Sequence, residues 1–259
     1  MPRSLLGKTV LVTRPRDQAQ ELQILLEARG ADTPVQPAVE ILPPENWNDV
    51  DDVLRQISKN KFGWALFSSA NGVRFVCDRA ASVLSGGARC LGAHINIAAV
   101  GPGTANVLNE YDLKASIVPE QFDADGLADA FVERYGNLFG RSFVSFRASR
   151  GRKTLSERLT ALGARVRETV AYRNVDVTTA DPEILAALQS GKIDFTTVTS
   201  SASARALAQM FGDGAKKTRW IAISPLTANA LRQEGIDVDA VAEEATMPSL
   251  VDAVVQAAH

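Results

Sequence analysis

Short turns rich in serine, threonine and glycine follow apolar runs throughout the sequence, and arginines lie in or beside several of them. At the start of a helix, such a turn presents free backbone N–H groups and the positive end of the helix dipole, which together bind anions. The pattern therefore predicts a site for a ligand that carries several anionic groups. The turns occupy residues 13–14, 68–72, 101–104, 147–152, 200–201 and 224–227.

Each turn taken alone also has a simpler interpretation. Serine and threonine before a helix commonly cap its first N–H groups, and proline suits the first helical turn because its missing N–H would have no partner there. None of the turns has the Walker P-loop spacing or the G-x-G-x-x-G pattern, so nucleotide binding has little support. The prediction of an anion site therefore depends on all the turns and arginines taken together. We expect them on one side of two sheets, facing a cleft.

Histidine and cysteine are too scarce for several common kinds of catalysis. His94 and His259 are the only histidines, which argues against a histidine triad or a site with several histidine ligands. Cys77 and Cys90 fit neither a disulfide framework nor a common zinc spacing. No pair of acidic residues stands out as an acid and base couple. An enzyme of this sequence would therefore work by positioning and electrostatic stabilisation.

Short apolar runs rich in β-branched residues alternate with helical patterns. Several runs are apolar at odd and even positions alike, which is typical of parallel strands covered on both faces. Two leucine patterns with helical spacing end at Gly30 and Gly163, which favours helix ends there. The alternation predicts an α/β fold of open, doubly wound parallel sheets. The predicted strands are 9–13, 64–68, 95–100, 143–146, 194–199 and 220–223.

Three pairs of segments repeat in the same order at a nearly constant offset. The clearest pair is A-A-V-G-P-G-T-A-N-V-L at 98–108 and I-A-I-S-P-L-T-A-N-A-L at 221–231. The others align residues 7–31 with 140–164 and residues 65–73 with 197–205, which places Ser69 on Ser201. A repeat unit this long indicates two homologous domains formed by duplication rather than a solenoid.

Two stretches look like connections between globular parts, namely 34–48, rich in proline, and 172–182, polar and β-branched. Both follow the first strand and helix of a repeat, so we expect the chain to cross between domains twice, as a two-stranded connection. The predicted domains are residues 1–36 with 176–259, and residues 37–175 including the connecting strands. Tyr172 lies at the end of a strand beside the second crossing, and from the residues alone it is interpreted as a packing or interface tyrosine.

Composition and charge exclude several classes of partner. With 46% hydrophobic residues in 259, the chain can bury one large core or two small ones. A net charge of −2 gives no electrostatic footprint for nucleic acid or an anionic membrane. The first residues lack the apolar region of a signal peptide, and no run is long enough to cross a bilayer, so we expect a cytoplasmic protein.

Together, these motifs resemble those of the uroporphyrinogen-III synthase family. They are V-L-V-T-R-P, F-S-S-A-N-G-V, A-V-G-P-G-T-A, R-A-S-R-G-R-K-T-L, A-Y-R, V-T-S-S, I-S-P-L-T-A-N-A-L and P-S-L-V-D-A-V, and they cover essentially the whole chain. The resemblance implies two α/β domains joined by a two-stranded connection, the first made from both chain ends. It further implies a monomer with no metal and no organic cofactor.

The reaction implied by the resemblance is cyclisation of the linear tetrapyrrole hydroxymethylbilane to uroporphyrinogen III, with loss of water and inversion of ring D through a spiro intermediate. The substrate is a polycarboxylate, and it closes to the uninverted isomer I without an enzyme. Catalysis would therefore consist mainly of holding the substrate so that the substituted carbon of ring D reaches the electrophile. We expect the protein to receive this substrate from the preceding pathway enzyme.

The resemblance also assigns roles to particular residues. Tyr172 matches the tyrosine of the family that is proposed to assist departure of the hydroxyl, and Thr227 matches a threonine of the last turn. Ser224 departs from the pattern, because the family often has glycine there. The predicted catalytic residue is Tyr172, and the predicted substrate-binding residues are Arg14, Ser68, Ser69, Asn71, Gly101, Thr104, Arg147, Arg152, Ser200, Ser201, Ser224 and Thr227.

A second class of function stays open at this stage. The same fold could serve as a non-catalytic, two-domain module that binds a tetrapyrrole or another anion, because a fold alone does not define a function.

Overall fold

The structure, a computed structural model, describes residues 4–151 and 153–259 and divides into two compact units. The first unit comprises the chain up to Glu40 together with Val175–His259, and the second comprises Ile41–Asn174. The sequence predicted boundaries after residues 36 and 175. The first boundary lies later because Ala38 is fully buried in the core of the first unit. The two crossing segments contain β2 (Val39–Leu42) and β6 (Arg165–Asp176), which are neighbours in one sheet.

The first unit contains a four-stranded sheet with the order β1-β7-β8-β9, and its paired strands are parallel. Its strands are β1 (Val10–Val12), β7 (Phe195–Val198), β8 (Arg219–Ala222) and β9 (Ala240–Val241). Its helices are α1 (Arg16–Glu27), α8 (Pro182–Gln189), η1 (Ser201–Ser203), α9 (Ala204–Phe211), η2 (Gly212–Lys217), α10 (Pro225–Gln233) and α11 (Met247–Ala258).

The second unit contains a five-stranded sheet with the order β2-β6-β5-β3-β4. Besides β2 and β6, its strands are β3 (Trp64–Phe67), β4 (Asn96–Ala99) and β5 (Ser142–Ala148). Its helices are α2 (Asn48–Ile57), α3 (Ala70–Val83), α4 (Arg89–His94), α5 (Pro102–Glu110), α6 (Ala124–Tyr135) and α7 (Thr154–Ala161). Within the described part of the chain, no helix is long and apolar enough to span a bilayer.

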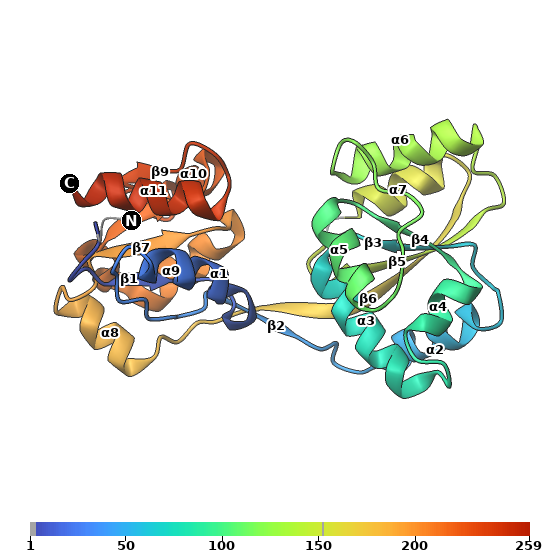
Figure 1. Ribbon diagram of the computed structural model, residues 1–259, viewed down its shortest axis with the longest axis horizontal. Helices are drawn as coiled ribbons and strands as arrows, with labels where there is room; N and C mark the ends of the chain where they lie inside the picture. Colours follow the sequence, from blue (N-terminus) through green and yellow to red (C-terminus); the bar gives the residue numbers. More distant parts are fainter. Residues whose placement is uncertain (1–3, 152) are drawn as a thin grey trace. The chain divides into compact units, whose positions relative to one another are not determined.

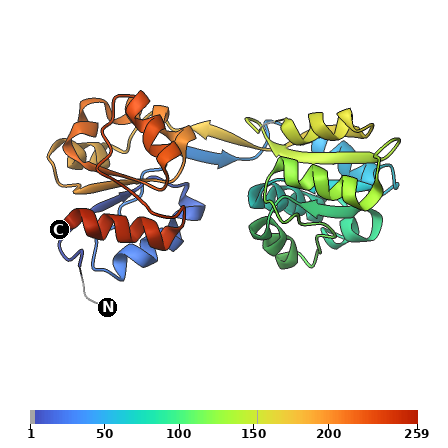
Figure 2. The same cartoon turned by 90° about the horizontal axis from the view of Figure 1, so that it is seen from above.

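Helices cover both faces of each sheet, which is the doubly wound arrangement that the sequence predicted. In β3, Trp64 and Leu66 pack with α6 and α7, whereas Ala65 and Phe67 pack into the core formed with α2 to α5. Figure 1 shows α6 and α7 on one side of this sheet and α2, α3 and α4 on the other. In the first unit, α1 and α11 share one face, as Figure 2 shows in blue and red, and α8, α9 and α10 cover the other.

All six predicted strands are confirmed. The strands β2 and β6, which were not among the six, differ from them in burial and polarity. Both faces of the six are buried over most of their length, and most of their residues are apolar at both parities. In contrast, β6 has charged or polar residues such as Arg165, Arg167 and Glu168 among its apolar ones, and β2 is only partly buried. Helix ends at glycine are also confirmed, because Gly30 and Gly163 follow α1 and α7 with φ of 92° and 89°. These left-handed values favour glycine.

The two similar turns at 101–104 and 224–227 have the same backbone conformation. Gly101 is the N-cap of α5 with φ −158° and ψ 171°, and Ser224 is the N-cap of α10 with φ −156° and ψ 160°. Pro102 and Pro225 are the first helical residues. The Oγ of Ser224 accepts a hydrogen bond from the N–H of Thr227 at 3.3 Å, whereas Gly101 has no side chain to do so. Each copy is a strand-to-helix junction, and the second adds a side-chain cap.

We predict that Ser224→Ala lowers the free energy of unfolding by about 1 kcal/mol and that Ser224→Gly lowers it by only a few tenths, because glycine tolerates the uncapped backbone. The converse change, Gly101→Ser, should be neutral or slightly stabilising, since its Cβ would lie 3.4 Å from the Cβ of Phe122. Urea unfolding of the three variants measures these differences. Equal losses in Ser224→Ala and Ser224→Gly would contradict the capping role.

Candidate functional site

Helix α3 begins directly after β3, at the carboxyl end of the sheet in the second unit. Ser69 is its N-cap, and the Ser69 Oγ accepts a hydrogen bond from the N–H of Gly72 at 3.1 Å. Ser68 is exposed just before the cap, and Asn71 is half-buried in the first turn. Ligands of parallel α/β sheets bind at this end of the strands. The turn that carries these three predicted residues is therefore placed where a substrate contact is expected.

A register shift between β5 and β6 determines where Tyr172 points. The two strands pair residue by residue up to Arg147 with Val170, but the next pair is Ala148 with Tyr172, so Ala171 is an extra residue in β6. Because side chains alternate along a strand, one extra residue turns the following side chain to the other face. Consequently Ala171 and Tyr172 both lie in the core formed with α2 to α5.

This placement brings together Tyr172 and Ser69, two residues that the sequence predicted for the site. The Tyr172 Oη lies 3.0 Å from the Ser69 Oγ. The phenol ring stacks against Phe75 of α3, with 5.8 Å between ring centroids and 9° between planes. Only 6% of Tyr172 is exposed. The ring is therefore fixed by packing, and its hydroxyl is held at the start of α3.

Burial is the main influence on the ionisation of Tyr172. Removal from water disfavours the phenolate and raises the pKa of Tyr172 above its ordinary value, while the hydrogen bond with Ser69 acts in the opposite, lowering direction. Tyr172 is therefore a neutral phenol at physiological pH, and a neutral phenol can donate its proton.

Arg147 has internal partners that the sequence did not reveal. One guanidinium nitrogen donates to the carbonyl oxygens of Ala148 and Gly151, each at 3.1 Å, and the Nε lies 3.3 Å from the Oε2 of Glu168. Only 15% of the side chain is exposed. These contacts tie the loop after β5 to β6 and favour a structural role over the predicted substrate contact. Arg152, the other arginine predicted in this loop, lies outside the described residues.

The start of α5 is next to the start of α3, because β4 and β3 are neighbours in the sheet. Gly101 is half-buried at the N-cap, and Thr104 is buried in the first turn. Phe122 lies beside this turn, close enough that a Cβ built on Gly101 would contact it, and 61% of its surface is exposed. The turn thus combines bare backbone with an exposed aromatic ring.

The predicted turns of the first unit also lie at helix starts. Ser200 is the N-cap of η1 and accepts a hydrogen bond from the N–H of Ala202 at 3.3 Å, while Ser201 is the first residue of that short helix. The repeat aligned Ser201 with Ser69, but the capping residue here is Ser200, because this copy begins with a 3₁₀ turn. The Thr227 hydroxyl lies 3.1 Å from the Ser224 Oγ, and Thr227 is only 3% exposed. These two side chains mainly organise the start of α10.

Arg14 follows β1 and is half-buried, and its guanidinium lies 2.8 Å from the sulfur of Met247 at the start of α11. A thioether is a weak acceptor. Arg14 therefore differs from Arg147, since Met247 does not neutralise its charge.

Sequence reasoning missed two aromatic residues at these turns. Phe75 stacks on Tyr172. The sequence around Phe75 did not indicate this contact, because Tyr172 lies on β6, which is distant in sequence from α3. Phe122 directly precedes Asp123, the N-cap of α6. An exposed apolar residue just before an N-cap is the signal that could have identified Phe122.

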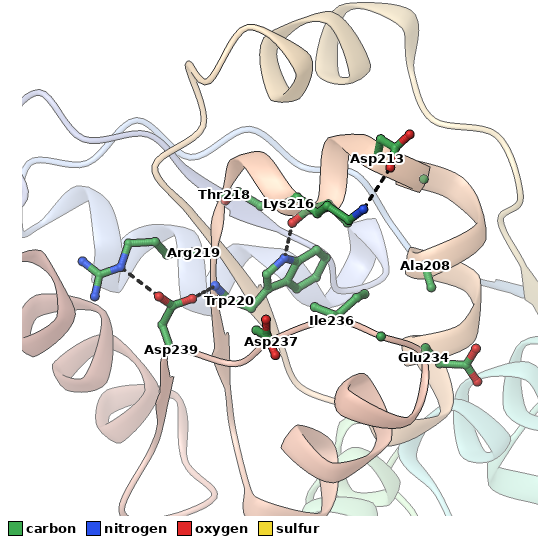
Figure 3. Close-up of a pocket in the computed structure, with 13 residues that line it drawn as sticks. Ala208, Asp213, Lys216, Thr218, Arg219, Trp220, Glu234, Ile236, Asp237 and Asp239 are labelled. Carbon is green, nitrogen blue, oxygen red and sulfur yellow. Dashed lines mark hydrogen bonds and ion pairs between the residues drawn. The ribbon is translucent and has the colours of Figure 1, made fainter.

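A hollow of about 560 Å³ in the first unit lies at the opposite, amino end of the strands, around the start of β8 (Figure 3). Its charges are largely paired with each other. The Nε of Arg219 lies 3.2 Å from Asp239, Lys216 lies 3.2 Å from Asp213, and the indole N–H of Trp220 donates to the carbonyl of Ala215. This hollow contains none of the predicted site residues. Among residues 4–151 and 153–259, no group of three His, Cys, Asp or Glu side chains is arranged to hold a metal ion.

Solved structures of uroporphyrinogen III synthases share this fold. A uroporphyrinogen-III synthetase from Helicobacter pylori has a TM-score of 0.66 and 15% identity, over 96% of this chain and 99% of that one. A mutant uroporphyrinogen III synthase from Thermus thermophilus has a TM-score of 0.61 and 20% identity, over 96% and 98%. At these identities the similarity defines the class of fold, which is a parallel α/β protein of the architecture found in these synthases.

Sequence comparison identifies the family. The profile described as uroporphyrinogen-III synthase HemD matches residues 20–252. The uroporphyrinogen-III synthase of Synechococcus elongatus is 29% identical over 263 residues, which cover 97% of this chain and 96% of the relative. The chain belongs to the uroporphyrinogen-III synthase family, and the resemblance found in the motifs is confirmed.

The raised pKa of Tyr172 leads to a prediction about stability at high pH. Tyr172 contributes fully to stability below the unfolded-state pKa of about 10 and progressively less as the pH rises from there through the folded-state pKa. Replacement by phenylalanine removes this contribution. The free energy of unfolding should therefore decrease less between about pH 8 and about pH 11 for Tyr172→Phe than for the natural sequence. Parallel decreases in the two proteins would show that Tyr172 titrates normally.

Proposed function

We propose that this chain acts as a uroporphyrinogen-III synthase, a hydro-lyase that converts hydroxymethylbilane to uroporphyrinogen III in tetrapyrrole biosynthesis. Family membership supports the reaction. The observation that supports this particular site is the buried Tyr172 phenol, held 3.0 Å from Ser69 at the carboxyl end of the sheet. It is a proton donor placed where parallel α/β proteins bind ligands.

In this proposal, Tyr172 donates its proton to the leaving hydroxyl of the bilane. The carbon–oxygen bond breaks, the oxygen keeps the electron pair and departs as water, and the pyrrole nitrogen, which keeps its proton, supplies electrons to form a protonated azafulvene cation. The substituted carbon of ring D attacks this electrophile, and the spiro intermediate fragments and closes again as isomer III. A positioned general acid contributes typically 10²–10⁴-fold to a rate.

The substrate carboxylates would be received by the helix starts rather than by a basic surface. First-turn N–H groups have no partner within the helix, and an anion placed there also meets the positive end of the dipole. Hydrogen bonds that involve a charged group are worth roughly 1.5–3 kcal/mol each, so a few are enough to hold a polycarboxylate. We assign this role to the turns at Ser68, Gly101 and Ser200, with Arg14 as a supporting cation.

A test of the function is the isomer composition of the product. Hydroxymethylbilane is generated in situ, the protein is added, and the oxidised products are separated into isomers I and III. We expect isomer III with the protein and isomer I without it. Isomer I alone in both samples would eliminate the synthase and leave the alternative, a non-catalytic module that binds a tetrapyrrole or another anion.

A change of charge at Ser68 tests the binding role of the α3 turn. Ser68→Asp adds a negative charge beside the helix start, where it does not destabilise the helix but repels a substrate carboxylate. We expect KM to rise several-fold, with a smaller change in kcat. Ser68→Asn, which has nearly the same shape without the charge, is the matched control and should keep KM within about two-fold. Equal KM values for the two variants would mean that no carboxylate binds at this turn.

The monomeric state, the absence of a cofactor, a cytoplasmic location and receipt of the bilane from the preceding enzyme stay predictions. The monomeric state is tested by size-exclusion chromatography with light scattering, for which we expect the mass of one 27.8 kDa chain.

A further inference from the structure

Ser69 has two polar neighbours whose roles as donor and acceptor differ. The backbone N–H of Gly72 can only donate, so the Ser69 Oγ accepts at 3.1 Å. The other neighbour, the Tyr172 Oη at 3.0 Å, can donate or accept. A serine hydroxyl has one proton to donate and two lone pairs. Its proton is therefore still available for Tyr172 after the helix cap has formed.

The cap favours one direction for the second hydrogen bond. A hydroxyl that accepts a hydrogen bond becomes a better donor, because the bonds of a chain polarise one another. The chain here begins at the N–H groups and positive dipole end of α3, which reinforces the same direction. Both effects favour donation from the Gly72 amide to Ser69 and from Ser69 to Tyr172, an arrangement that leaves the proton of Tyr172 free for another acceptor.

We propose that Ser69 is a positioning residue, which directs the Tyr172 proton toward the substrate and stabilises the phenolate that forms when the proton is transferred. The proposal rests on the function proposed above and changes the predicted role of Ser69 from a substrate contact to a residue that acts through Tyr172. Phe75 supports it because its ring stacks on the phenol and limits displacement of the whole side chain, which keeps the Tyr172 Oη beside Ser69.

The proton transfer balances without an additional reactant. The leaving hydroxyl takes the Tyr172 proton and the electron pair of its carbon–oxygen bond and departs as water. The resulting charge on the Tyr172 Oη is compensated by the Ser69 O–H, which a buried phenolate requires because little water reaches it. When the closed macrocycle releases a proton from carbon to restore its pyrrole, the phenolate recovers a proton.

Three substitutions of Ser69 separate donation from helix capping. Ser69→Thr keeps the hydroxyl and the cap, Ser69→Ala removes both, and Ser69→Asp keeps a strong cap but cannot donate when ionised. Single-turnover formation of isomer III gives the chemical rate apart from substrate affinity. We expect Ser69→Thr to stay within a few-fold of the natural sequence, and Ser69→Ala and Ser69→Asp to be slower by about ten-fold or more. A rate for Ser69→Asp equal to that of Ser69→Thr would overturn the proposal, because capping alone would then suffice.

A double-mutant cycle with Tyr172→Phe tests whether Ser69 acts through Tyr172. We expect Ser69→Ala to cause little further loss in the Tyr172→Phe background, since the group it serves is already absent. An equal fold-loss in both backgrounds would contradict a role through Tyr172. Asp181→Ala, which removes the N-cap of α8, is the control and should lower the melting temperature while leaving the rate unchanged. Failure of the natural sequence to form isomer III would refute the proposed function itself, which is a different outcome from any of these.

Discussion

The register shift at Ala171 determines on which face of the sheet Tyr172 lies, and the proposed chemistry depends on it. Without the extra residue, alternation would turn Tyr172 toward the side covered by α6 and α7. With it, the phenol meets Ser69 and Phe75 at the start of α3. Bulges often re-aim a side chain next to an active site, and this one directs the Tyr172 side chain toward the start of α3.

The parallel architecture explains why the polar turns occur repeatedly in one sequence. Several strands of such a sheet lead to helix starts at the same carboxyl end, so one type of turn can serve several positions. The free N–H groups at a helix start can be capped by a side chain or can bind a carboxylate of a ligand. Which of these occurs depends on whether the N-cap residue has a side chain that accepts their hydrogen bonds. Ser224 and Thr227 are engaged with each other and with the backbone, whereas Gly101 leaves its turn open.

The strands and helix ends were predictable because they follow from local physics. Burial on both faces makes most residues of the six predicted strands apolar at both parities, and a left-handed helix end favours glycine, as at Gly30 and Gly163. Residue contacts across the sheet were less predictable. Tyr172 and Ser69 could be named from motifs, but their contact depends on the extra residue in β6, which no motif reveals. Arg147 looked like an anion ligand because its partner Glu168 lies on another strand. The origin of the two units by duplication stays a prediction.

The most direct measurement for this account is the single-turnover rate at which Tyr172→Phe forms isomer III from hydroxymethylbilane. The substitution removes one oxygen and keeps the ring that packs on Phe75, so the fold should be retained, as circular dichroism and the melting temperature at neutral pH can verify. We expect a rate lower by about ten-fold or more, with isomer I accumulating as the spontaneous product. An unchanged rate of isomer III formation in a folded variant would show that Tyr172 is a packing residue and would contradict the account.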